Sequence, residues 1–371
     1  MTQTKDQVIR ILLVDDSAFM RKALTMMLES DPGIKVIGTA RDGQEGVEKV
    51  RLLKPDLVTL DIEMPRMDGL TALREIMDKT PVPVMMVSSI TTDGAQATLD
   101  ALELGAVDFI PKQMSYVSLD IVKIQADLIA KIKDIARRRH HLMARFRQRR
   151  FARIGQGQAT AGPPTSSAMV SYQPGKPVRK RSHNVSIIAI GTSTGGPPAL
   201  QAVVPRLPRN LPVGIIVAQH MPPTFTKSLA ERLDGLSQVT VREAANGDKI
   251  EPGLVLVAPG GRHLTIRKRG PVSYAVVSDQ PADTLYKPCV DVMMNSVAKE
   301  HGRSSLGVIM TGMGNNGVVG IKNVKQQGGV VIAQDEASCI VYGMPRAIVE
   351  AKLADHVTPL DNIAAEIVSY F

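Results

Sequence analysis

The sequence contains little cysteine and no long apolar run, and both shortages limit what the protein can be. Cys289 and Cys339 are its only cysteines, so no disulfide framework is predicted and a reducing compartment is the simpler setting. Every apolar run falls far short of the ~20 residues that a membrane helix needs. The polar residues 1–7 also lack the apolar core of a signal peptide. We therefore expect a cytoplasmic protein with no membrane insertion.

Length and composition predict two folded domains. The chain of 371 residues exceeds what one compact core usually holds, and its 44% hydrophobic and 22% charged residues are typical of globular proteins. Residues 8–125 and 184–371 both alternate short apolar runs with amphipathic stretches, which is the pattern of a parallel sheet with crossover helices. The expected fold class is α/β in both domains, with a linker over residues 126–183.

The net charge of +9 is concentrated in that linker. Twelve of the 45 basic residues and only one of the 36 acidic residues lie between Asp134 and His183, so the rest of the chain is close to neutral. The segment favours the end of an Arg-rich helix followed by a flexible linker, and a patch for acidic lipid, RNA or an acidic receptor surface is the alternative. A DNA-binding function would need a compact helical reader after the linker. Strands and glycine turns are predicted there instead, so we expect no nucleic-acid partner.

Polar side chains follow four apolar runs of the first domain. The runs are residues 9–14, 56–60, 84–87 and 107–111, and the residues that follow them are Asp15, Asp16, Asp61, Ser88 and Lys112. Because the carboxyl ends of parallel strands border one crevice, these side chains are predicted to converge. Packed carboxylates repel one another unless a cation joins them, and hard oxygen ligands suit Mg²⁺. Asp61 can then act as a nucleophile toward a phosphoryl group, with Mg²⁺ and Lys112 neutralising the developing charge.

The first domain resembles the response-regulator receiver family. The matching motifs are Val14-Asp-Asp-Ser17, Leu60-Asp-Ile-Glu-Met-Pro65 with Asp68-Gly69, Ser88 and Lys112. The resemblance implies a doubly wound parallel sheet and a histidine kinase as phosphodonor. It further implies the roles of single residues: Asp61 as phosphoacceptor, Asp15 and Asp16 as metal ligands together with Asp61 and the Glu63 carbonyl, and Ser88, Phe109 and Lys112 as switch residues.

A serine motif opens the second domain. An apolar run at residues 185–190 leads into Gly191-Thr-Ser-Thr-Gly-Gly196, and a helix-compatible stretch follows at 199–203. A strand, a Gly-x-Ser-x-Gly turn and a helix are typical of a nucleophile elbow, which makes Ser193 a candidate nucleophile. Taken alone, the motif is equally compatible with a glycine loop that binds an anion at a helix N-terminus.

Two further strand ends could complete a hydrolase site. The apolar run at residues 213–218 ends before Gln219 and His220, and a histidine there could act as general base for Ser193. The run at 306–310 ends in the glycine turn 311–317, whose backbone amides could stabilise a tetrahedral oxyanion. Considered singly, these motifs are also compatible with a capped surface histidine and a tight strand-to-helix connection.

Taken together, the motifs of the second domain resemble the chemotaxis protein-glutamate methylesterase family. They are the serine motif, Gln219-His-Met221, Thr311-Gly-Met-Gly314, and Gln334-Asp-Glu-Ala-Ser338 with Val341-Tyr-Gly-Met-Pro345. The resemblance implies a three-layer α/β hydrolase-type domain without a cofactor. In it, Ser193 is the nucleophile, His220 the general base, the Met313 region the oxyanion site, and an acid at position 316 orients the histidine.

The same resemblance implies the reaction and the partners. Family members hydrolyse glutamate methyl esters on methyl-accepting chemotaxis receptors and often deamidate receptor glutamines. Their unphosphorylated receiver domain covers the active site. The expected function is therefore that of a hydrolase regulated by phosphorylation.

Position 316 departs from the family, because Asn316 stands where the family has aspartate. In the serine-protease triad the corresponding change lowers kcat by about 10⁴, or roughly 5 kcal/mol. Three outcomes are open: a slow enzyme, an enzyme in which Asp335 or Glu336 substitutes, or a catalytically weakened receptor-binding protein controlled by phosphorylation. The first two are preferred. The Asn316-Gly317 pair could also deamidate spontaneously to aspartate.

Overall fold

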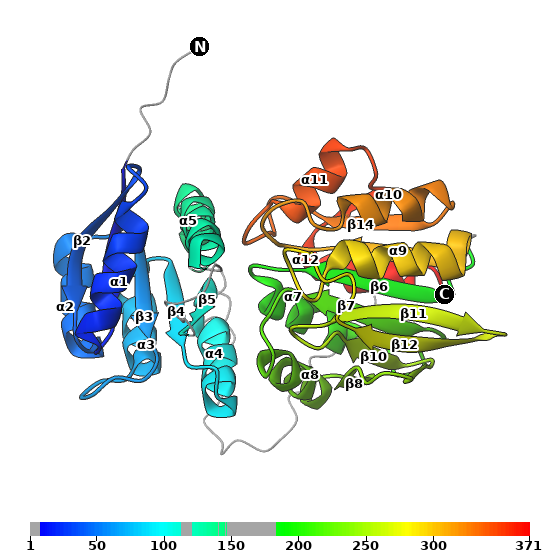
Figure 1. Ribbon diagram of the computed structural model, residues 1–371, viewed down its shortest axis with the longest axis horizontal. Coiled ribbons are helices and arrows are strands. Elements are labelled where there is room, and N and C mark those ends of the chain that lie inside the picture. Colours follow the sequence, from blue (N-terminus) through cyan, green and yellow to red (C-terminus); the bar gives the residue numbers. More distant parts are fainter. Residues whose placement is uncertain (1–7, 113–120, 140, 145, 147–182) are drawn as a thin grey trace, which may run out of the picture.

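A computed structural model describes residues 8–112, 121–139, 141–144, 146 and 183–371, which form two α/β domains side by side (Figure 1). Most of the expected linker, including residues 147–182, lies outside this part of the chain. Among the described residues, no helix is both long and apolar enough to cross a membrane.

The first domain is built on a parallel sheet with the strand order β2-β1-β3-β4-β5. Its strands are β1 (Ile9–Val14), β2 (Ile34–Ala40), β3 (Leu57–Asp61), β4 (Val84–Ser88) and β5 (Asp108–Pro111). Its helices are α1 (Ala18–Glu29), α2 (Gly43–Leu53), α3 (Gly69–Lys79), α4 (Thr92–Leu104) and α5 (Ile121–Arg137). Apolar side chains of α1 and α5 pack on one face of the sheet and those of α2, α3 and α4 on the other. The predicted doubly wound fold is confirmed.

Side-chain caps fix where four of these helices begin. Ser17, Asp42, Asp68 and Thr91 precede α1, α2, α3 and α4, and each side chain accepts a hydrogen bond from a backbone N–H of the first helical turn. Such caps satisfy N–H groups that have no partner within the helix. The loops between strand and helix are therefore anchored at the edge of the sheet where the predicted site lies.

The first domain extends past its expected end at residue 125, which falls inside α5. Later residues of this helix are tied to the first domain, because Lys133 pairs with Asp31. Just beyond the helix, Arg139 lies 3.3 Å from Asp56. The boundary drawn from the sequence cuts a helix whose second half completes the core.

The second domain is built on a larger parallel sheet with the order β15-β14-β13-β6-β7-β10-β8. Its strands are β6 (Ile187–Thr192), β7 (Gly214–Gln219), β8 (Thr240–Glu243), β10 (Leu254–Val257), β13 (Ser305–Ile309), β14 (Val330–Gln334) and β15 (His356–Thr358). A separate antiparallel sheet contains β9 (Lys249–Ile250), β11 (His263–Arg269) and β12 (Val272–Ser278). The central strands carry apolar side chains on both faces, as parallel sheets covered by helices do.

Helices cover both faces of the larger sheet. The helices are α7 (Gly196–Val203), α8 (Phe225–Leu236), α9 (Val290–His301), α10 (Val318–Gln326), α11 (Met344–Glu350) and α12 (Leu360–Val368), with short 3-10 helices at Val204–Arg206 and Gly302–Ser304. Buried side chains of α7, α8 and α12 belong to one core, and those of α9, α10 and α11 to the other. The predicted three-layer arrangement is confirmed.

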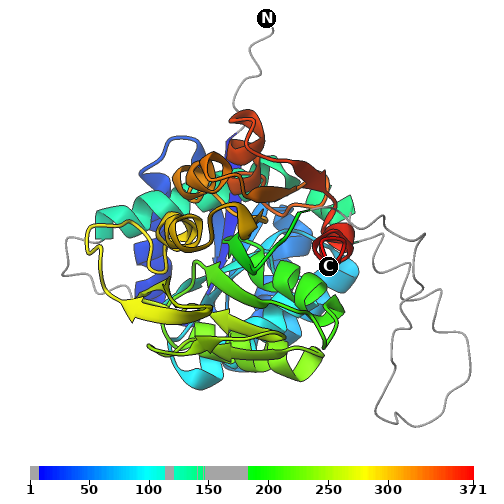
Figure 2. The ribbon, with the colours of Figure 1, turned by 90° about the vertical axis from the view of Figure 1, so that its right-hand side faces the viewer.

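The two domains pack against each other through α4, β5 and α5 of the first domain. Helix α4 lies beside α8 and α7 of the second domain (Figure 1). Viewed from the side of the second domain, the first domain lies directly behind it (Figure 2). One apolar cluster continues from the first domain into the second. The interface therefore covers one end of the larger sheet.

Candidate active site

Ser193 lies in a tight turn between β6 and α7. Its backbone N–H donates to the Thr311 carbonyl (3.0 Å), and Gly195 adopts a left-handed conformation with φ 74°. A Cβ on Gly196 would approach Gln219 Oε1 to 1.9 Å, so only glycine fits there. The strand, turn and helix that a nucleophile elbow requires are all present.

His220 follows β7, the strand next to β6, and its backbone N–H donates to the Thr192 carbonyl (3.1 Å). Its ring stacks on Tyr286 with 4.3 Å between the centroids, and its Nε2 lies 2.9 Å from Asn316 Oδ1. The other ring nitrogen, Nδ1, is buried and has no hydrogen-bond partner among the described residues. Ser193, His220 and Met313 line one cavity of about 310 Å³. The structure thus brings together the residues expected to be nucleophile, base and oxyanion site.

Asn316 occupies the orienting position beside His220, and both ends of its amide are bonded. Oδ1 accepts from Val290 N (2.7 Å) as well as facing His220 Nε2. Nδ2 donates to Asp291 Oδ2 (2.8 Å) and Cys289 Sγ (3.2 Å). Because an amide oxygen only accepts, Nε2 of His220 must carry the proton, which leaves Nδ1 as the basic nitrogen.

Asp335 and Glu336, the acids considered as substitutes for the aspartate missing at position 316, bond to other groups than His220. Asp335 Oδ1 accepts from the backbone N–H of Ser338 (3.0 Å), and Glu336 pairs with Arg138 at 3.1 Å. The carboxylate nearest to the Asn316 amide belongs instead to Asp291, in the first turn of α9. No sequence motif singled out Asp291, which is 25 residues from its partner.

Burial determines the protonation of His220. It lowers the pKa of the ring to about 4; the bond to Asn316 opposes this shift and the charge of Lys131 adds to it. Burial alone would lower the pKa of Lys131 as well, but Asp108 and Asp127 raise it, so a fixed cation faces the site. At neutral pH the ring is therefore an uncharged base, and its protonated form is disfavoured.

The first domain supplies one wall of the cavity. Asp108, Phe109, Pro111, Asp127 and Lys131 all line it together with Ser193. Asp108 Oδ2 accepts from the hydroxyl of Thr194, the residue after Ser193 (2.9 Å), and pairs with Lys131 at 3.1 Å.

Two further contacts hold the domains together beside this wall. Phe109 stacks on Phe225 of α8 with 4.7 Å between the centroids. Arg232 of α8 lies 2.5 Å from both Asp100 and Glu103 of α4. In this arrangement the first domain covers Ser193.

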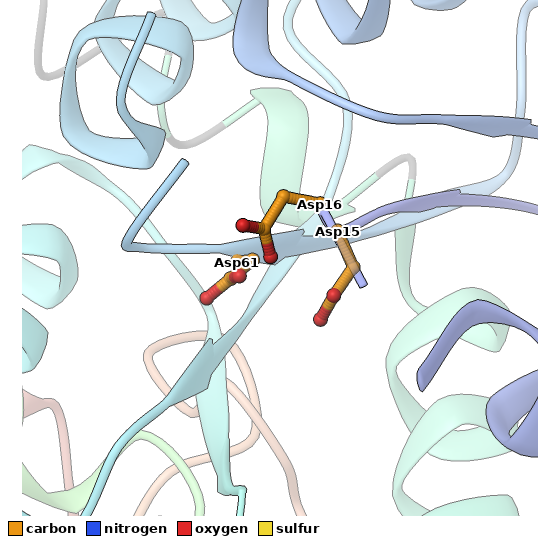
Figure 3. A group of neighbouring side chains, drawn as sticks. All are labelled: Asp15, Asp16 and Asp61. Carbon is orange, nitrogen blue, oxygen red and sulfur yellow. The ribbon is translucent and has the colours of Figure 1, made fainter. Parts of the chain in front are cut away.

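A second site lies at the carboxyl edge of the first domain's sheet. Carboxylate oxygens of Asp15, Asp16 and Asp61 lie within 4.8 Å of one another (Figure 3). Burial raises the pKa of Asp61 to about 6 against its 2.6 Å ion pair with Lys112, and the charge of Asp15 raises it further. Asp15 Oδ2 is buried without a partner among the described residues. A partnerless buried oxygen within an all-carboxylate set fits a hard divalent cation such as Mg²⁺.

The remaining expected receiver residues surround this cluster. Ser88 Oγ accepts from Thr98 Oγ1 at 2.7 Å and lies within donating distance of the Gly94 carbonyl of α4 (3.1 Å) and of the Ser89 carbonyl (3.2 Å), so it is held by α4 and its own loop. The Glu63 backbone N–H donates to Asp61 Oδ1 (3.3 Å), which places the Glu63 peptide beside the Asp61 carboxylate.

Comparisons with known proteins cover both domains. The response regulator receiver domain family matches residues 11–121, and the CheB methylesterase family matches residues 188–367. A protein-glutamate methylesterase/protein-glutamine glutaminase 1 of Oleidesulfovibrio alaskensis is 53% identical over 98% of this chain and 99% of its own length. One numbered 2 from Nitratidesulfovibrio vulgaris is 52% identical over 98% and 99%. The crystal structure of the Thermotoga maritima CheB methylesterase catalytic domain is 40% identical and covers 50% of this chain and 99% of its own, with a TM-score of 0.49.

Proposed function

The chain belongs to the protein-glutamate methylesterase/protein-glutamine glutaminase family, with a receiver in front of a CheB methylesterase domain, and we propose that phosphorylation of Asp61 controls its hydrolysis of glutamate methyl esters on methyl-accepting chemotaxis receptors. The observation that carries the proposal is the shared cavity, in which Ser193 and His220 lie against the receiver's Phe109 and Lys131. A serine and a histidine provide ester hydrolysis, and the receiver wall provides its control.

The ester reaction uses two side chains that line one cavity. Ser193 Oγ attacks the ester carbonyl carbon while His220 Nδ1 takes the hydroxyl proton. The tetrahedral intermediate collapses, methanol leaves with that proton, and a glutamyl ester on Ser193 remains. Water, deprotonated by the same nitrogen, then attacks this ester and releases the glutamate side chain and the serine. Deamidation of a glutamine follows the same course, with ammonia as the leaving group.

The negative oxygen of the tetrahedral intermediate needs hydrogen-bond donors. In the described part of the chain, the backbone N–H groups of Thr194 and Met313 donate to no protein acceptor. Gly312 packs so closely that an added Cβ would lie 2.9 Å from Ser193 Cβ. These two amides flank the serine, and we assign them to the oxyanion.

Control starts at the acid cluster. Asp61 attacks the phosphoryl group donated by a chemotaxis histidine kinase, and Lys112 remains close enough to pair with it. Mg²⁺ bound by Asp15, Asp16 and Asp61, with the Glu63 carbonyl, would neutralise part of the phosphoryl charge. Ser88 then exchanges its α4 contacts for the phosphoryl oxygens.

Phe109 connects this change to the interface. Its strand β5 pairs directly with β4, where Ser88 lies, and its ring stacks on Phe225 of the catalytic domain. Movement of Phe109 toward the space that Ser88 leaves removes this stack, which weakens the interface and opens the cavity.

Methanol release from methylated receptor membranes tests the proposal. The full chain, given acetyl phosphate and Mg²⁺, should release methanol faster than without them, and Ser193→Ala should release none above background. Asp61→Asn should keep the basal rate and lose the stimulation. Methanol release by Ser193→Ala at the parent rate would contradict the nucleophile assignment, and stimulation of Asp61→Asn would contradict the control assigned to Asp61.

A further inference from the structure

The hydrogen bonds of Asn316 form a chain that ends at a carboxylate. His220 Nε2 bonds Asn316 Oδ1 at 2.9 Å, and Asn316 Nδ2 donates to Asp291 Oδ2 at 2.8 Å. Asp291 Oδ1 is held in turn by the backbone N–H of Gly320 in α10, at 2.9 Å. The histidine is thus linked through one amide to an acid on another helix.

We propose that Asp291 is a positioning residue for His220, which acts through Asn316 in place of the carboxylate that position 316 lacks. The inference rests on the proposed function, because it assigns a role within the same esterase site. Asp291 touches no reacting atom. It fixes the orientation of the Asn316 amide and places negative charge one side chain away from the imidazole.

The orientation argument follows from donors and acceptors. With the amide as observed, Oδ1 meets the Val290 N–H (2.7 Å) and the His220 ring, while Nδ2 meets the Asp291 carboxylate. Reversing the amide would set its NH₂ group against the Val290 N–H and its oxygen against that carboxylate. Asp291 therefore selects the orientation in which an oxygen faces His220. That oxygen fixes the tautomer, with the proton on Nε2 and the basic nitrogen at Nδ1.

The charge argument concerns the protonated ring that forms during the reaction. Hydrogen bonds in series polarise one another, so a carboxylate that accepts from Nδ2 increases the negative charge on Oδ1. The effect strengthens the acceptor for His220 when the ring carries its second proton. Since burial opposes that charged form, this support raises the rate of the step that produces it.

The network also predicts what aspartate at position 316 would do in this chain. Asn316→Asp would place an oxygen where Nδ2 now lies, 2.8 Å from Asp291 Oδ2. Two carboxylates at that distance repel each other and share a proton. The single variant should therefore gain much less than the about 10⁴ expected from a triad carboxylate alone.

Exchanging the two side chains removes this conflict. In Asn316→Asp with Asp291→Asn, the new amide donates its NH₂ to the carboxylate at 316 and accepts from the Gly320 N–H. Every bond of the chain is kept, and the negative charge moves next to His220. In Asp291→Asn alone, the new amide has a single oxygen but faces two donors, the Asn316 NH₂ and the Gly320 N–H. Its own NH₂ group must therefore face one of these donors.

The test is a double-mutant cycle on the full chain, with all proteins treated alike with acetyl phosphate and Mg²⁺. Asp291→Asn should lower kcat for receptor methyl esters by about 10–100-fold, the scale seen for partners that orient metal-ligating side chains, with little change in KM. The double variant should exceed both single variants and reach at least the parent kcat. Asp283→Asn, an exposed acid of the preceding loop, is the matched control and should retain the parent kcat.

The rate at which a fluorophosphonate labels Ser193 is measured beside methanol release, because it reports the serine and histidine without a receptor. Labelling that follows the cycle while no receptor methanol appears would reject the substrate and leave the Asp291 assignment standing. If folded Asp291→Asn keeps the parent labelling rate and kcat, or if the double variant only multiplies the effects of the single ones, Asp291 has no positioning role. A double variant that folds but stays as slow as Asp291→Asn has the same meaning, since a structural role would not be rescued by the exchange.

Discussion

Asp61 in the receiver and His220 in the catalytic domain are both buried reactive groups, and burial moves their pKa values in opposite directions. The pKa of Asp61 rises to about 6 and that of His220 falls to about 4. In both sites burial favours the uncharged form. The two sites differ in how accessible they are. Asp16 of the acid cluster is exposed to solvent, whereas a whole domain forms one wall of the cavity around His220. A small ligand can reach the first site, and a domain must move to open the second.

Removal of the receiver should change the rate of methanol release more than any other variant considered below. Residues 184–371 alone should release methanol about 5–150-fold faster than the unphosphorylated full chain, the usual range for coupling between two sites. The physical reason is that Phe109, Asp127 and Lys131 no longer line the cavity. Rates are compared at equal protein concentration on the same receptor membranes. Equal rates would exclude inhibition by the receiver.

A milder version of this comparison keeps both domains. Arg232→Gln removes the ion pairs with Asp100 and Glu103 across the interface, so basal methanol release should rise several-fold toward that of the isolated domain. Arg209→Gln, an exposed arginine of the same domain, is the matched control. An unchanged rate in Arg232→Gln would mean that other contacts of the interface hold the two domains together.

The pH dependence of Ser193 labelling tests the cause of the His220 shift. In the proposed mechanism the basic form of the ring is the active one, so labelling by a fluorophosphonate should fall only near pH 4 in the full chain. In residues 184–371, with Lys131 and part of the burial removed, the pKa should rise toward its ordinary 6.5, and the acid limb should move to higher pH with it.

Within the full chain, Lys131→Met should shift this limb in the same direction by less, because only the nearby charge is removed. Lys133→Met, which changes a lysine paired with Asp31 on the receiver, is the control. A limb at the same pH in all four proteins would show that the receiver does not set the pKa of His220.

Asp61→Asn should produce the smallest effect, a gain in stability of the receiver without Mg²⁺. Because its folded pKa of about 6 lies above the usual 3.8, the Asp61 carboxyl favours folding below pH 3.8, and this contribution is lost as the pH rises through 6. Above pH 6 the buried charge therefore destabilises by up to about 3 kcal/mol, at 1.36 kcal/mol per pKa unit.

Thermal unfolding in EDTA should show a higher Tm for Asp61→Asn at pH 7.5 and none of this gain near pH 4. Glu48→Gln, which changes an exposed acid in the middle of α2, should change neither value. An equal gain at both pH values would mean that the charge of Asp61 is not its source.

Strand ends account for what the sequence could predict. Parallel strands point their carboxyl ends at one edge, so Asp15, Asp61 and Lys112 could be placed together from the sequence alone, and so could Ser193 and His220. The rule is local to each strand and its following loop. It correctly located these side chains because their positions depend on sheet order and not on distant packing.

The residues that the sequence did not reveal come from packing between distant segments. Asp291 reaches Asn316 only because α9 lies against α10, and Lys131 faces His220 only because the domains dock. The sequence also did not reveal what opposes spontaneous deamidation at the Asn316-Gly317 pair. Four hydrogen bonds hold the Asn316 carboxamide, which opposes its rotation onto the backbone nitrogen of Gly317.

The hydrogen bond between Thr194 and Asp108 lets the catalytic domain affect the receiver as well as the receiver the catalytic domain. Because the loop of the nucleophile is tied to the receiver, a receptor segment that enters the cavity must displace Asp108 and its neighbours. Thermodynamic linkage then requires that substrate binding favours phosphorylation by the same free energy by which phosphorylation favours substrate binding. Under the proposed function, a bound receptor is therefore an effector of the acid cluster, and the phosphorylated state is most favoured in molecules that already hold their substrate.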